Sequence, residues 1–560
     1  MAASAIFLFL VANRGAYQGY FSGDDLDNLR WTRPVPLADF AVALLSPRYY
    51  PNNFRPVGHG IYHVMGWKFG LSFPPYAALI HLLHGLNCLL LWLLIRRLAS
   101  DGGQSGLQRA AAVGAGVLFF GFHAVTLDAF WKPMYVFDLT CATLTLLCLL
   151  SYDSRRYVVS FAAFWVAIKA KELAVMLPLV LLAYECWLGD RRWKRLAPFF
   201  AASALIGMQA LWTNRAAGEA YSLRLSPSTL AETAAYYAQR IMPWAWLAVP
   251  LVAAPVLLRD KRIGWGYASF AALLAPLLLL PGRMAGAYLY VPFAGLAVAV
   301  TAMLLRAPRP LGAIAVAAWL PLNYYFLRDY RRAELTNAWE NRRYMESLMK
   351  QRAEMAGVKT FLYDGYPQTL NWWGILGGLR IALDSDEIRL QPLQDANMTE
   401  VLAADGAALL MWDPAGRELS VVVRRPGDQE ASYLTLDRRT PVWQLGEGWY
   451  QLEHGYRWIK PRATARLRRP ANAERFEIYV NVGPDYIRSV GRSHVEVLVN
   501  GERLGAAEFT AEGWQRRSWP LPRGPAGPAD VEIRVLPEFR PDKTDPRALG
   551  TAIGGFGFRP

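Results

Sequence analysis

The sequence predicts a polytopic α-helical membrane protein that continues into a C-terminal α/β unit followed by a β-sandwich. The first observation behind this prediction is composition: of 560 residues, 54% are hydrophobic and only 19% are charged, which is too apolar for soluble domains of this length. The second is distribution. Apolar runs able, or nearly able, to cross a hydrocarbon layer of about 30 Å recur as far as Leu327, and the composition changes after Tyr330.

The net charge of +15 lies almost entirely in the apolar part of the chain. Residues up to Tyr330 contain 28 Lys and Arg against 15 Asp and Glu, and the remaining residues contain 32 against 30. A basic excess scattered between apolar runs is typical of short cytoplasmic loops, whereas a nucleic-acid-binding protein concentrates it on one water-soluble face. Membrane lipid is therefore an expected partner, and nucleic acid is not.

About eleven apolar runs are predicted to span the membrane, and two segments need separate treatment. The run from Ala2 to Asn13 is short, so we expect an upstream start or completion by flanking residues; without a basic segment before it, it does not resemble a signal peptide. The segment from Phe54 to Gly70 carries two histidines and a lysine. It is predicted to lie on the outer leaflet as an interfacial helix, with Tyr62 and Trp67 as aromatic anchors.

The positions of the basic residues predict the orientation of the helices. Five short basic loops alternate with less basic ones, and cytoplasmic loops are the basic ones. The alternate loops and the tail after Leu327 are then extracytoplasmic. The five clusters are Arg96/Arg97/Arg109, Arg155/Arg156, Arg191/Arg192/Lys194/Arg195, Arg259/Lys261/Arg262 and Arg306/Arg309.

The tail is predicted to contain a helical stalk, a small α/β unit and a β-sandwich. Strand-like runs flank a helix-like stretch in the α/β unit, and short strands alternate with Gly/Pro turns after about residue 440. The expected domains are 1–328 (transmembrane and catalytic), 329–357 (stalk), 358–436 (α/β) and 437–560 (sandwich). The expected strands are Val358–Tyr363, Ala407–Trp412, Leu419–Val423, Arg475–Val480, His494–Val499 and Val531–Val535, with a helix at Trp372–Leu383.

The acidic motif Gly23-Asp24-Asp25-Leu26-Asp27 follows the first apolar run. Acidic groups beside a bilayer must be kept in water, be paired with a cation, or take part in function. One interpretation makes one carboxylate a general base for an acceptor hydroxyl, with its neighbour raising its pKa. The other is a solvated loop that caps the next helix. The motif alone does not separate them.

Further polar residues are predicted to face the same side of the membrane. Several cations there favour a phosphate or pyrophosphate headgroup, because Arg and Lys form charge-assisted hydrogen bonds to phosphate oxygens. The alternative for each cation is that it extends from the bilayer to the interface. The residues are Arg55, Asp128, Lys132, Lys171, Glu172, Arg283 and Tyr288.

Histidine pairs raise the possibility of a metal site. His59 and His63 are four residues apart, and His81 and His84 are three apart. Position 60 is glycine, so the glutamate of a zinc-protease helix is missing. We expect no metal and no other cofactor, with these histidines in packing and hydrogen bonding.

Four short motifs resemble the GT-C superfamily of integral-membrane glycosyltransferases. In their order and spacing, residues 1–330 are similar to protein O-mannosyltransferases and the bacterial aminoarabinose transferases, the family 39 type. The motifs are Asp24-Asp25, Phe54-Arg55-Pro56 with Tyr62, Lys171-Glu172 before Leu177-Pro178, and Arg283 before Tyr288-Leu289-Tyr290-Val291-Pro292 with Gly295.

The resemblance implies transfer of a sugar, with inversion, from a polyprenyl-phosphate carrier at the outer face of a bacterial inner membrane. It implies Asp24 as the catalytic base, with Asp25 as the alternative. Arg55, Lys171 and Arg283 then hold the donor phosphate, and the remaining polar residues contact substrate. The sequence also resembles the tetratricopeptide-bearing relatives of the protein O-mannosyltransferases, but no tetratricopeptide array follows residue 330. The resemblance therefore leaves the acceptor open between protein, glycan and lipid, and it leaves the sugar open too.

Two other functions are compatible with outward-facing cations. A lipid-linked oligosaccharide ligase or polymerase would use them without the acidic pair, and a polyprenyl-lipid transporter or flippase would place ionisable residues in mid-span. In the tail, a segment around Trp449 and Trp458 resembles β-sandwich modules of glycan-building enzymes. Its aromatic rings are expected to fill the core rather than to stack on sugars.

Overall fold

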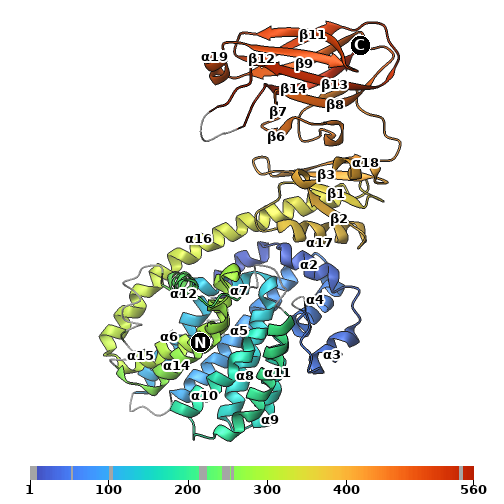
Figure 1. The fold of residues 1–560 in the computed structure, drawn as a ribbon. Helices are drawn as coiled ribbons and strands as arrows, with labels where there is room; N and C mark the ends of the chain where they lie inside the picture. Colours follow the sequence, from blue (N-terminus) through green and yellow to red (C-terminus); the bar gives the residue numbers. More distant parts are fainter. Residues whose placement is uncertain are drawn as a thin grey trace. The chain divides into compact units, whose positions relative to one another are not determined.

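The computed structural model in Figure 1 describes residues 9–51, 54–99, 105–213, 223–242, 253, 258–541 and 547–560. The expected first span, Ala2 to Asn13, falls mostly outside these residues. The chain forms two compact units. The first is Met1–Arg342 with Gln368–Gly377, and the second is Arg343–Pro367 with Gly378–Pro560.

The first unit is helical. Three short helices, α2 (Gly23–Trp31), α3 (Leu37–Leu45) and α4 (Pro56–Phe69), precede the longer ones. The longer helices are α5 (Pro74–Leu98), α6 (Gly106–Phe122), α8 (Val136–Asp153), α9 (Tyr157–Ala170), α10 (Leu177–Trp187), α11 (Ala197–Thr213), α12 (Pro227–Ile241), α14 (Lys261–Leu278), α15 (Tyr290–Arg306) and α16 (Arg309–Lys350). The short connecting elements used below are α7 (Leu127–Trp131), η3 (Pro133–Tyr135), η4 (Glu172–Met176), η8 (Pro281–Arg283) and η9 (Gly286–Leu289).

Local sequence explains where several of these helices begin. Ser105, Ser226 and Asp260 each precede a helix, and their side chains accept hydrogen bonds from backbone N–H groups of the first turn. These caps satisfy donors that have no partner inside the helix. Proline occupies the first turn of α4 and of α5, where its missing N–H costs no hydrogen bond.

Among the described residues, five helices are long and apolar enough to cross a membrane, or six if a pair bent by 46° counts as one span. The prediction of about eleven spans is not confirmed. One reason is visible after Ser154, where α9 has 14 residues and α10 has 11, with η4 between them. At about 1.5 Å per residue, neither helix alone reaches across about 30 Å of hydrocarbon.

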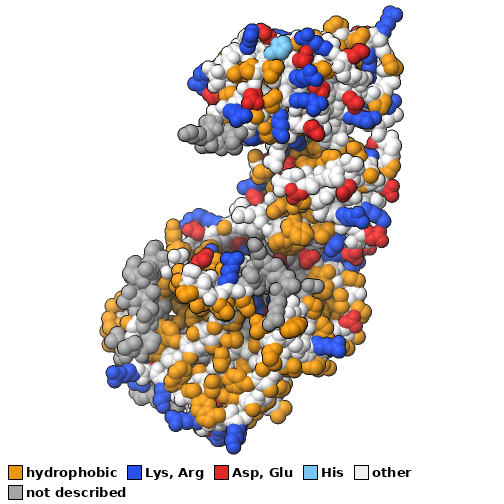
Figure 2. Space-filling view, in the orientation of Figure 1, with side chains coloured by type: hydrophobic (Ala, Val, Ile, Leu, Met, Phe, Trp, Pro, Cys, Tyr) orange, Lys and Arg blue, Asp and Glu red, His pale blue; other side chains and the backbone are white. Residues whose placement is uncertain are grey.

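The outer surface of the helical unit is apolar. Figure 2 shows hydrophobic side chains covering much of it. Among them are Leu82 of α5, Val158 of α9 and Trp212 of α11, which are 70%, 84% and 73% exposed. A contiguous apolar surface of this kind needs lipid rather than water around it, so the surface supports a membrane location. In contrast, 72% of the apolar stretch of α8 and of α15 is buried inside the unit.

The five basic loops meet at one end of the helical unit. This is expected if all five lie on the same side of the membrane, as the sequence predicts. Arg97 at the end of α5 binds Asp153 at the end of α8, and Arg155 binds Asp190 after α10. Asp260 before α14 binds both Arg262 and Arg306. Arg262 in turn donates to the carbonyl of Leu98 at the end of α5. The alternation predicted from charge is therefore consistent with the packing of the helices.

Helix α4 lies where the interfacial helix was predicted. Its 14 residues are too few to span a bilayer. Trp67 is 83% exposed, as an aromatic anchor must be. The prediction for Tyr62 is wrong: its side chain is 2% exposed, and its hydroxyl donates to Asp25 at 2.5 Å. The hydrogen bond to the buried Asp25 carboxylate, near the start of α2, holds the Tyr62 phenol inside the protein.

The second unit begins with a four-stranded sheet in the order β2-β1-β3-β4. The strands are β1 (Thr360–Asp364), β2 (Arg389–Pro392), β3 (Ala407–Asp413) and β4 (Glu418–Arg424), and the helices are α17 (Asn371–Leu383) and α18 (Met398–Ala403). β1 runs parallel to β2 and β3, and β4 is antiparallel to β3. All seven residues of β3 are buried, as expected for a central strand covered on both faces.

The C-terminal region is β-rich. One sheet has the order β11-β10-β13-β8, and the other has the order β12-β9-β14-β7-β6, with β5 paired to β14. Alternate residues of β9, from Phe476 to Val482, point into a hydrophobic core that also contains Val495 and Ile533 of the other sheet. The strands are β5 (Tyr433–Thr435), β6 (Trp449–Glu453), β7 (Tyr456–Ile459), β8 (Arg462–Arg469), β9 (Arg475–Val482), β10 (Ser493–Val499), β11 (Glu502–Phe509), β12 (Gly513–Pro520), β13 (Gly527–Leu536) and β14 (Ala552–Arg559).

The predicted elements of the tail occur within a few residues of their expected positions. The predicted stalk, 329–357, is mostly the continuation of α16, which runs unbroken from Arg309 to Lys350. Both α16 and α17 contribute residues to both units. The division between the units therefore falls inside helices, where the sequence shows no change in composition.

Candidate functional site

The acidic motif forms the first turn of α2. Ser22 is the N-cap, and its backbone N–H and hydroxyl both donate to Asp25 Oδ2, at 2.8 and 2.7 Å. This reciprocal capping box satisfies helix donors that have no other partner. Tyr62 donates to the other oxygen of Asp25. Asp25 therefore has a structural task in this turn, which the sequence motif alone left open.

The Asp25 carboxyl is fully buried. Burial raises its pKa to about 6, and the hydrogen bonds from Tyr62 and Ser22 oppose this rise. The ordinary pKa of an aspartate in an unfolded chain is about 3.9. The folded protein therefore holds this proton more tightly than the unfolded chain does.

We expect Asp25 to make the protein less stable as the pH rises from about 4 to about 6. A carboxyl whose pKa is raised by folding contributes stability below its unfolded pKa, and that contribution is lost as the pH passes the folded pKa. The measurement is the melting temperature of the wild type minus that of Asp25→Asn across this range. This difference should fall with pH; a constant difference would contradict the raised pKa.

Asp24 is placed differently from its neighbour. Its side chain is only half-buried, and its Oδ1 accepts a hydrogen bond of 2.7 Å from the indole N–H of Trp373 on α17. Backbone contact between α2 and this distant segment makes the bond possible. A Cβ on Gly23 would lie 1.9 Å from the Leu370 carbonyl oxygen, and one on Gly374 would lie 2.4 Å from the Gly23 Cα. Only glycine fits at either position.

Arg55 and Glu172 form a bidentate ion pair between the start of α4 and η4. The Arg55 Nε lies 3.0 Å from both carboxylate oxygens, and Nη2 lies 2.9 Å from Oε2. The Glu172 charge raises the pKa of Arg55, and Arg55 lowers that of Glu172, in each case against the effect of burial. The guanidinium also lies over the ring of Phe137. Both groups are therefore charged and held in fixed positions.

Lys171 makes the second ion pair of this region. Its ammonium group lies 2.5 Å from Asp138 Oδ1, and the two side chains are 10% and 2% exposed. The same ammonium lies 4.4 Å from the ring centre of Tyr288 on η9. Asp138 and Tyr288 also contribute to the raised pKa of Arg55. The structure thus brings Arg55, Lys171, Glu172 and Tyr288 into one cluster, here named the cation cluster, with Asp138 as its fifth member.

Tyr135 connects the cation cluster to the acidic motif. It ends η3, next to Met134, whose sulfur lies 3.2 Å from the Ser22 hydroxyl oxygen, and α8 with Asp138 follows directly. The sequence-based prediction missed both Tyr135 and Asp138. A carboxylate inside an apolar run is a recognised signal for function, so Asp138 could have been found from the sequence. Nothing in the sequence singles out Tyr135.

Lys132 and Asp128 form a separate ion-paired group. Lys132 lies 3.3 Å from Asp128 and 2.7 Å from Glu334 of α16. These carboxylates raise the pKa of Lys132 against the effect of burial. Asp128 also acts on Tyr135, so this group borders the same region. Arg283, the last predicted phosphate ligand, ends η8 three residues before η9 and is half-buried.

The histidines are engaged within the protein. His59 accepts from the Arg55 backbone N–H, and burial lowers its pKa to about 3. His63 contacts the Thr32 carbonyl, and His84 contacts the Tyr290 hydroxyl and the Gly121 carbonyl. Within the described ranges, His, Cys, Asp and Glu side chains do not gather in threes as metal ligands.

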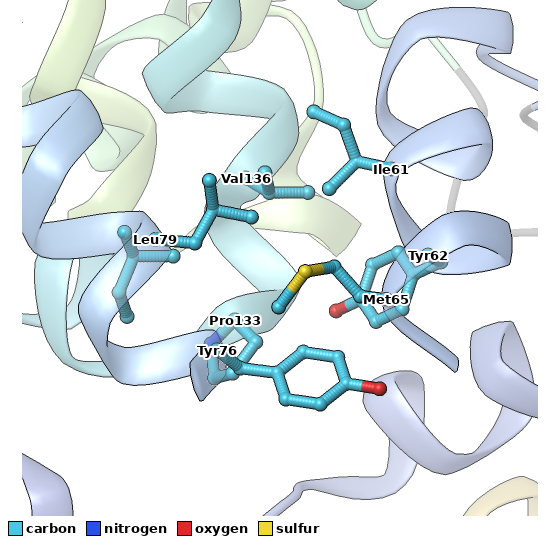
Figure 3. Close-up of a pocket in the computed structure, with 8 residues that line it drawn as sticks. Ile61, Tyr62, Met65, Tyr76, Leu79, Pro133 and Val136 are labelled. Carbon is cyan, nitrogen blue, oxygen red and sulfur yellow. The ribbon is translucent and has the colours of Figure 1, made fainter. Parts of the chain in front are cut away.

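A small cavity lies behind Tyr62, between α4, α5 and the start of α8 (Figure 3). Its volume of about 10 Å³ is that of one water molecule at most. Ile61, Met65, Leu79 and Val136 contribute apolar walls. The cavity is too small to hold a sugar or a phosphate.

Comparison with known proteins gives matches among solved structures alone. No protein-family model and no curated protein match the sequence. ArnT from Cupriavidus metallidurans bound to undecaprenyl phosphate is 13% identical, with a TM-score of 0.45, and its apo state is 14% identical, with a TM-score of 0.47; each match covers 74% of this chain and 94% of that one.

Two mycobacterial enzymes also match. Arabinosyltransferase EmbB from Mycobacterium smegmatis is 14% identical over 99% of this chain and 64% of that one, with a TM-score of 0.35. Arabinofuranosyltransferase AftD from Mycobacteria is 11% identical over 100% and 58%, with a TM-score of 0.40.

Proposed function

We propose that this protein transfers a sugar from a polyprenyl-phosphate carrier to an acceptor hydroxyl, at the extracytoplasmic face of a bacterial inner membrane. The observation that carries the proposal is that the accessible carboxylate Asp24 and the ion-paired cations Arg55 and Lys171 lie around the same stretch of chain: η3 contacts the start of α2 through Met134 and Ser22, and α8 follows it with Asp138. Transfer from a lipid phosphate needs a base for the acceptor and positive charge for the leaving group. Both are present in this region.

Asp24 is the proposed general base. It is half-buried, whereas Asp25 is fully buried and occupied by three hydrogen bonds. In the proposed step, Asp24 takes the acceptor hydroxyl proton as the acceptor oxygen bonds to the anomeric carbon. The bond from that carbon to the phosphate oxygen breaks, and its electrons leave with the lipid phosphate. Attack from the opposite face inverts the anomeric carbon. Trp373 orients the base through Oδ1.

The cation cluster is the proposed phosphate site. Glu172 engages Nε and Nη2 of Arg55, which leaves the Nη1 donors for a phosphate oxygen. Lys171 gives one of its three donors to Asp138. Arg283 is the proposed third phosphate ligand, and Tyr288, Asp128, Lys132 and Glu172 border the substrate. Fixed cations neutralise the leaving group without reorganisation, so the proposal requires neither a metal nor a cofactor.

An apolar cavity of about 630 Å³ offers a place for the isoprenoid chain. It is lined by residues of α6, α12, α15 and α16, including Phe119, Met303, Leu311 and Trp319. A chain of branched hydrocarbon units gains free energy from burial against such side chains. Undecaprenyl phosphate, the lipid bound in the ArnT crystal structure, belongs to this chemical class.

The proposal is tested by mass spectrometry of polyprenyl-phosphate sugars and surface glycans in cells that carry the wild type, Asp24→Asn, or no copy. We expect Asp24→Asn to reproduce the deletion, with one lipid-linked sugar accumulating and one glycan residue missing. Asp39→Asn, at an exposed aspartate of α3, is the matched control and should behave as wild type.

The same experiment separates transfer from its alternatives. If Asp24→Asn behaves as wild type while the deletion alters the glycans, the acidic motif is not catalytic, and a ligase or polymerase that depends on the cations replaces the proposal. A transporter is distinguished by a second measurement, oxidation of the lipid-linked sugar by a membrane-impermeant reagent in sided vesicles: if the deletion leaves the sugar on the cytoplasmic face of the membrane, the protein is a transporter.

A further inference from the structure

A third cavity, which is polar, lies entirely within the C-terminal unit. Its volume is about 460 Å³. The loop after β1 lines one side, and the β6–β7 hairpin lines the other. The residues used below are Asp364, Tyr366, Gln394, Trp449, Tyr450 and Arg457, all of which border the cavity.

Arg457 is an unexpected residue for its position. On β7 the side chains alternate, and Arg457 and Ile459 are the two buried ones. Arg457 is only 4% exposed. Charged side chains are almost never this deeply buried unless they are paired. The strand therefore places a cation where a sheet normally carries an apolar side chain.

The Arg457 guanidinium is incompletely bonded. Nη1 donates to the Tyr450 carbonyl at 3.0 Å. Nε and Nη2 are buried and have no hydrogen-bond partner among the residues that the structure describes. The carboxylate of Asp364, also at the cavity, acts on the charge of Arg457 but forms no ion pair with it within the described chain. An isolated buried cation is costly, and an anion held close to it removes that cost.

The remaining cavity walls have the chemistry that recognises sugars. Tyr366 is 37% exposed. Trp449 is stacked on Phe556 on one side, and its indole N–H donates to the Thr464 carbonyl, so its ring is fixed. Fixed aromatic rings beside planar polar groups such as Asp364 and Gln394 provide an apolar face and hydroxyl partners together. The volume of about 460 Å³ lies within the range of about 300–1,000 Å³ that is usual for small-molecule sites.

We propose that this cavity binds a sugar residue that carries a carboxylate or phosphate group, with Arg457 as the ligand for that anion. The ring lies against the aromatic walls, and Asp364 and Gln394 accept or donate hydrogen bonds to its hydroxyls. Arg is the side chain best matched to such an anion, since its donors are planar and paired. This site is separate from the transfer chemistry proposed for the helical unit and gives the tail its own ligand.

The test is isothermal titration of the full-length protein in detergent with matched neutral and acidic disaccharides. The pairs are cellobiose with cellobiouronic acid, and maltose with maltose 6′-phosphate. We expect at least one acidic member to bind ten-fold or more tightly than its neutral partner. Arg457→Met should abolish this preference, and Arg457→Lys should keep part of it. The control Arg462→Met, at an exposed arginine on β8, the next strand along the chain, should leave it intact.

Two results would overturn the proposal. One is equal or absent binding of acidic and neutral members in both pairs. The other is an acid preference that survives Arg457→Met. Thermal unfolding distinguishes a purely structural role. If Arg457 were purely structural, Arg457→Met would lower the melting temperature, and no acidic sugar would raise the melting temperature of the wild type. If Arg457→Met fails to fold, two other variants decide. Arg457→Lys should reduce the preference for the acidic disaccharide, and Gln394→Ala should reduce the affinity for it; wild-type values in both variants would overturn the proposal.

Discussion

Replacing Asp24 by asparagine should reduce the rate of sugar transfer by about 100- to 10,000-fold, the usual contribution of a general base. Asparagine keeps the side-chain oxygen that accepts from Trp373, so the helix start and its packing against α17 should be retained. The measurement is kcat of the purified full-length protein, together with its melting temperature. We expect a large loss of kcat with an unchanged melting temperature.

The neighbouring variant Asp25→Asn should show the opposite pattern. Its carboxylate accepts from the Ser22 backbone, the Ser22 hydroxyl and Tyr62, and an amide has only one oxygen to replace two. Loss of an N-cap interaction costs about 0.5–2 kcal/mol. The melting temperature should fall while kcat changes less than ten-fold. If Asp25→Asn were the inactive variant and Asp24→Asn the active one, the assignment of the base would be reversed.

Breaking the Lys171–Asp138 ion pair should have the largest effect on stability. Both side chains are buried at 2.5 Å separation. Removing one partner of a buried pair leaves an uncompensated charge and costs about 3–5 kcal/mol. Asp138→Asn and Lys171→Met should each lower the melting temperature in detergent by several degrees. Arg155→Met, which breaks an exposed ion pair with Asp190, should cost less than about 1 kcal/mol.

The double variant Lys171→Met with Asp138→Leu separates stability from function. A buried ion pair replaced by apolar side chains of similar size is often as stable as the original. We expect the double variant to recover the melting temperature and to remain inactive, since the proposed phosphate ligand is gone. Recovery of both would show that Lys171 is purely structural. Full activity of Lys171→Met alone would remove it from the phosphate site.

The sequence by itself indicated a membrane protein and placed the five basic loops on one common side. Hydropathy marks the membrane part, and the basic loops do share one end of the unit, as Arg97, Arg155 and Arg262 show through their partners on neighbouring helices. Strand alternation located the tail strands, because a period of two is a local property. The count of about eleven spans is not confirmed: the described residues contain five or six such helices, and the helices on either side of η4 are too short to count as spans.

Only the tertiary structure decided how the acidic pair divides its tasks. Asp24 and Asp25 are adjacent and chemically identical in the sequence. In the structure, Asp25 is buried and forms part of the capping box of α2, whereas Asp24 accepts a hydrogen bond from Trp373, 349 residues away. The same holds for the pairing of Asp138 with Lys171 and for the buried, incompletely bonded guanidinium of Arg457 in the tail. Burial and pairing depend on contacts between segments far apart in the chain, and no local pattern records such contacts.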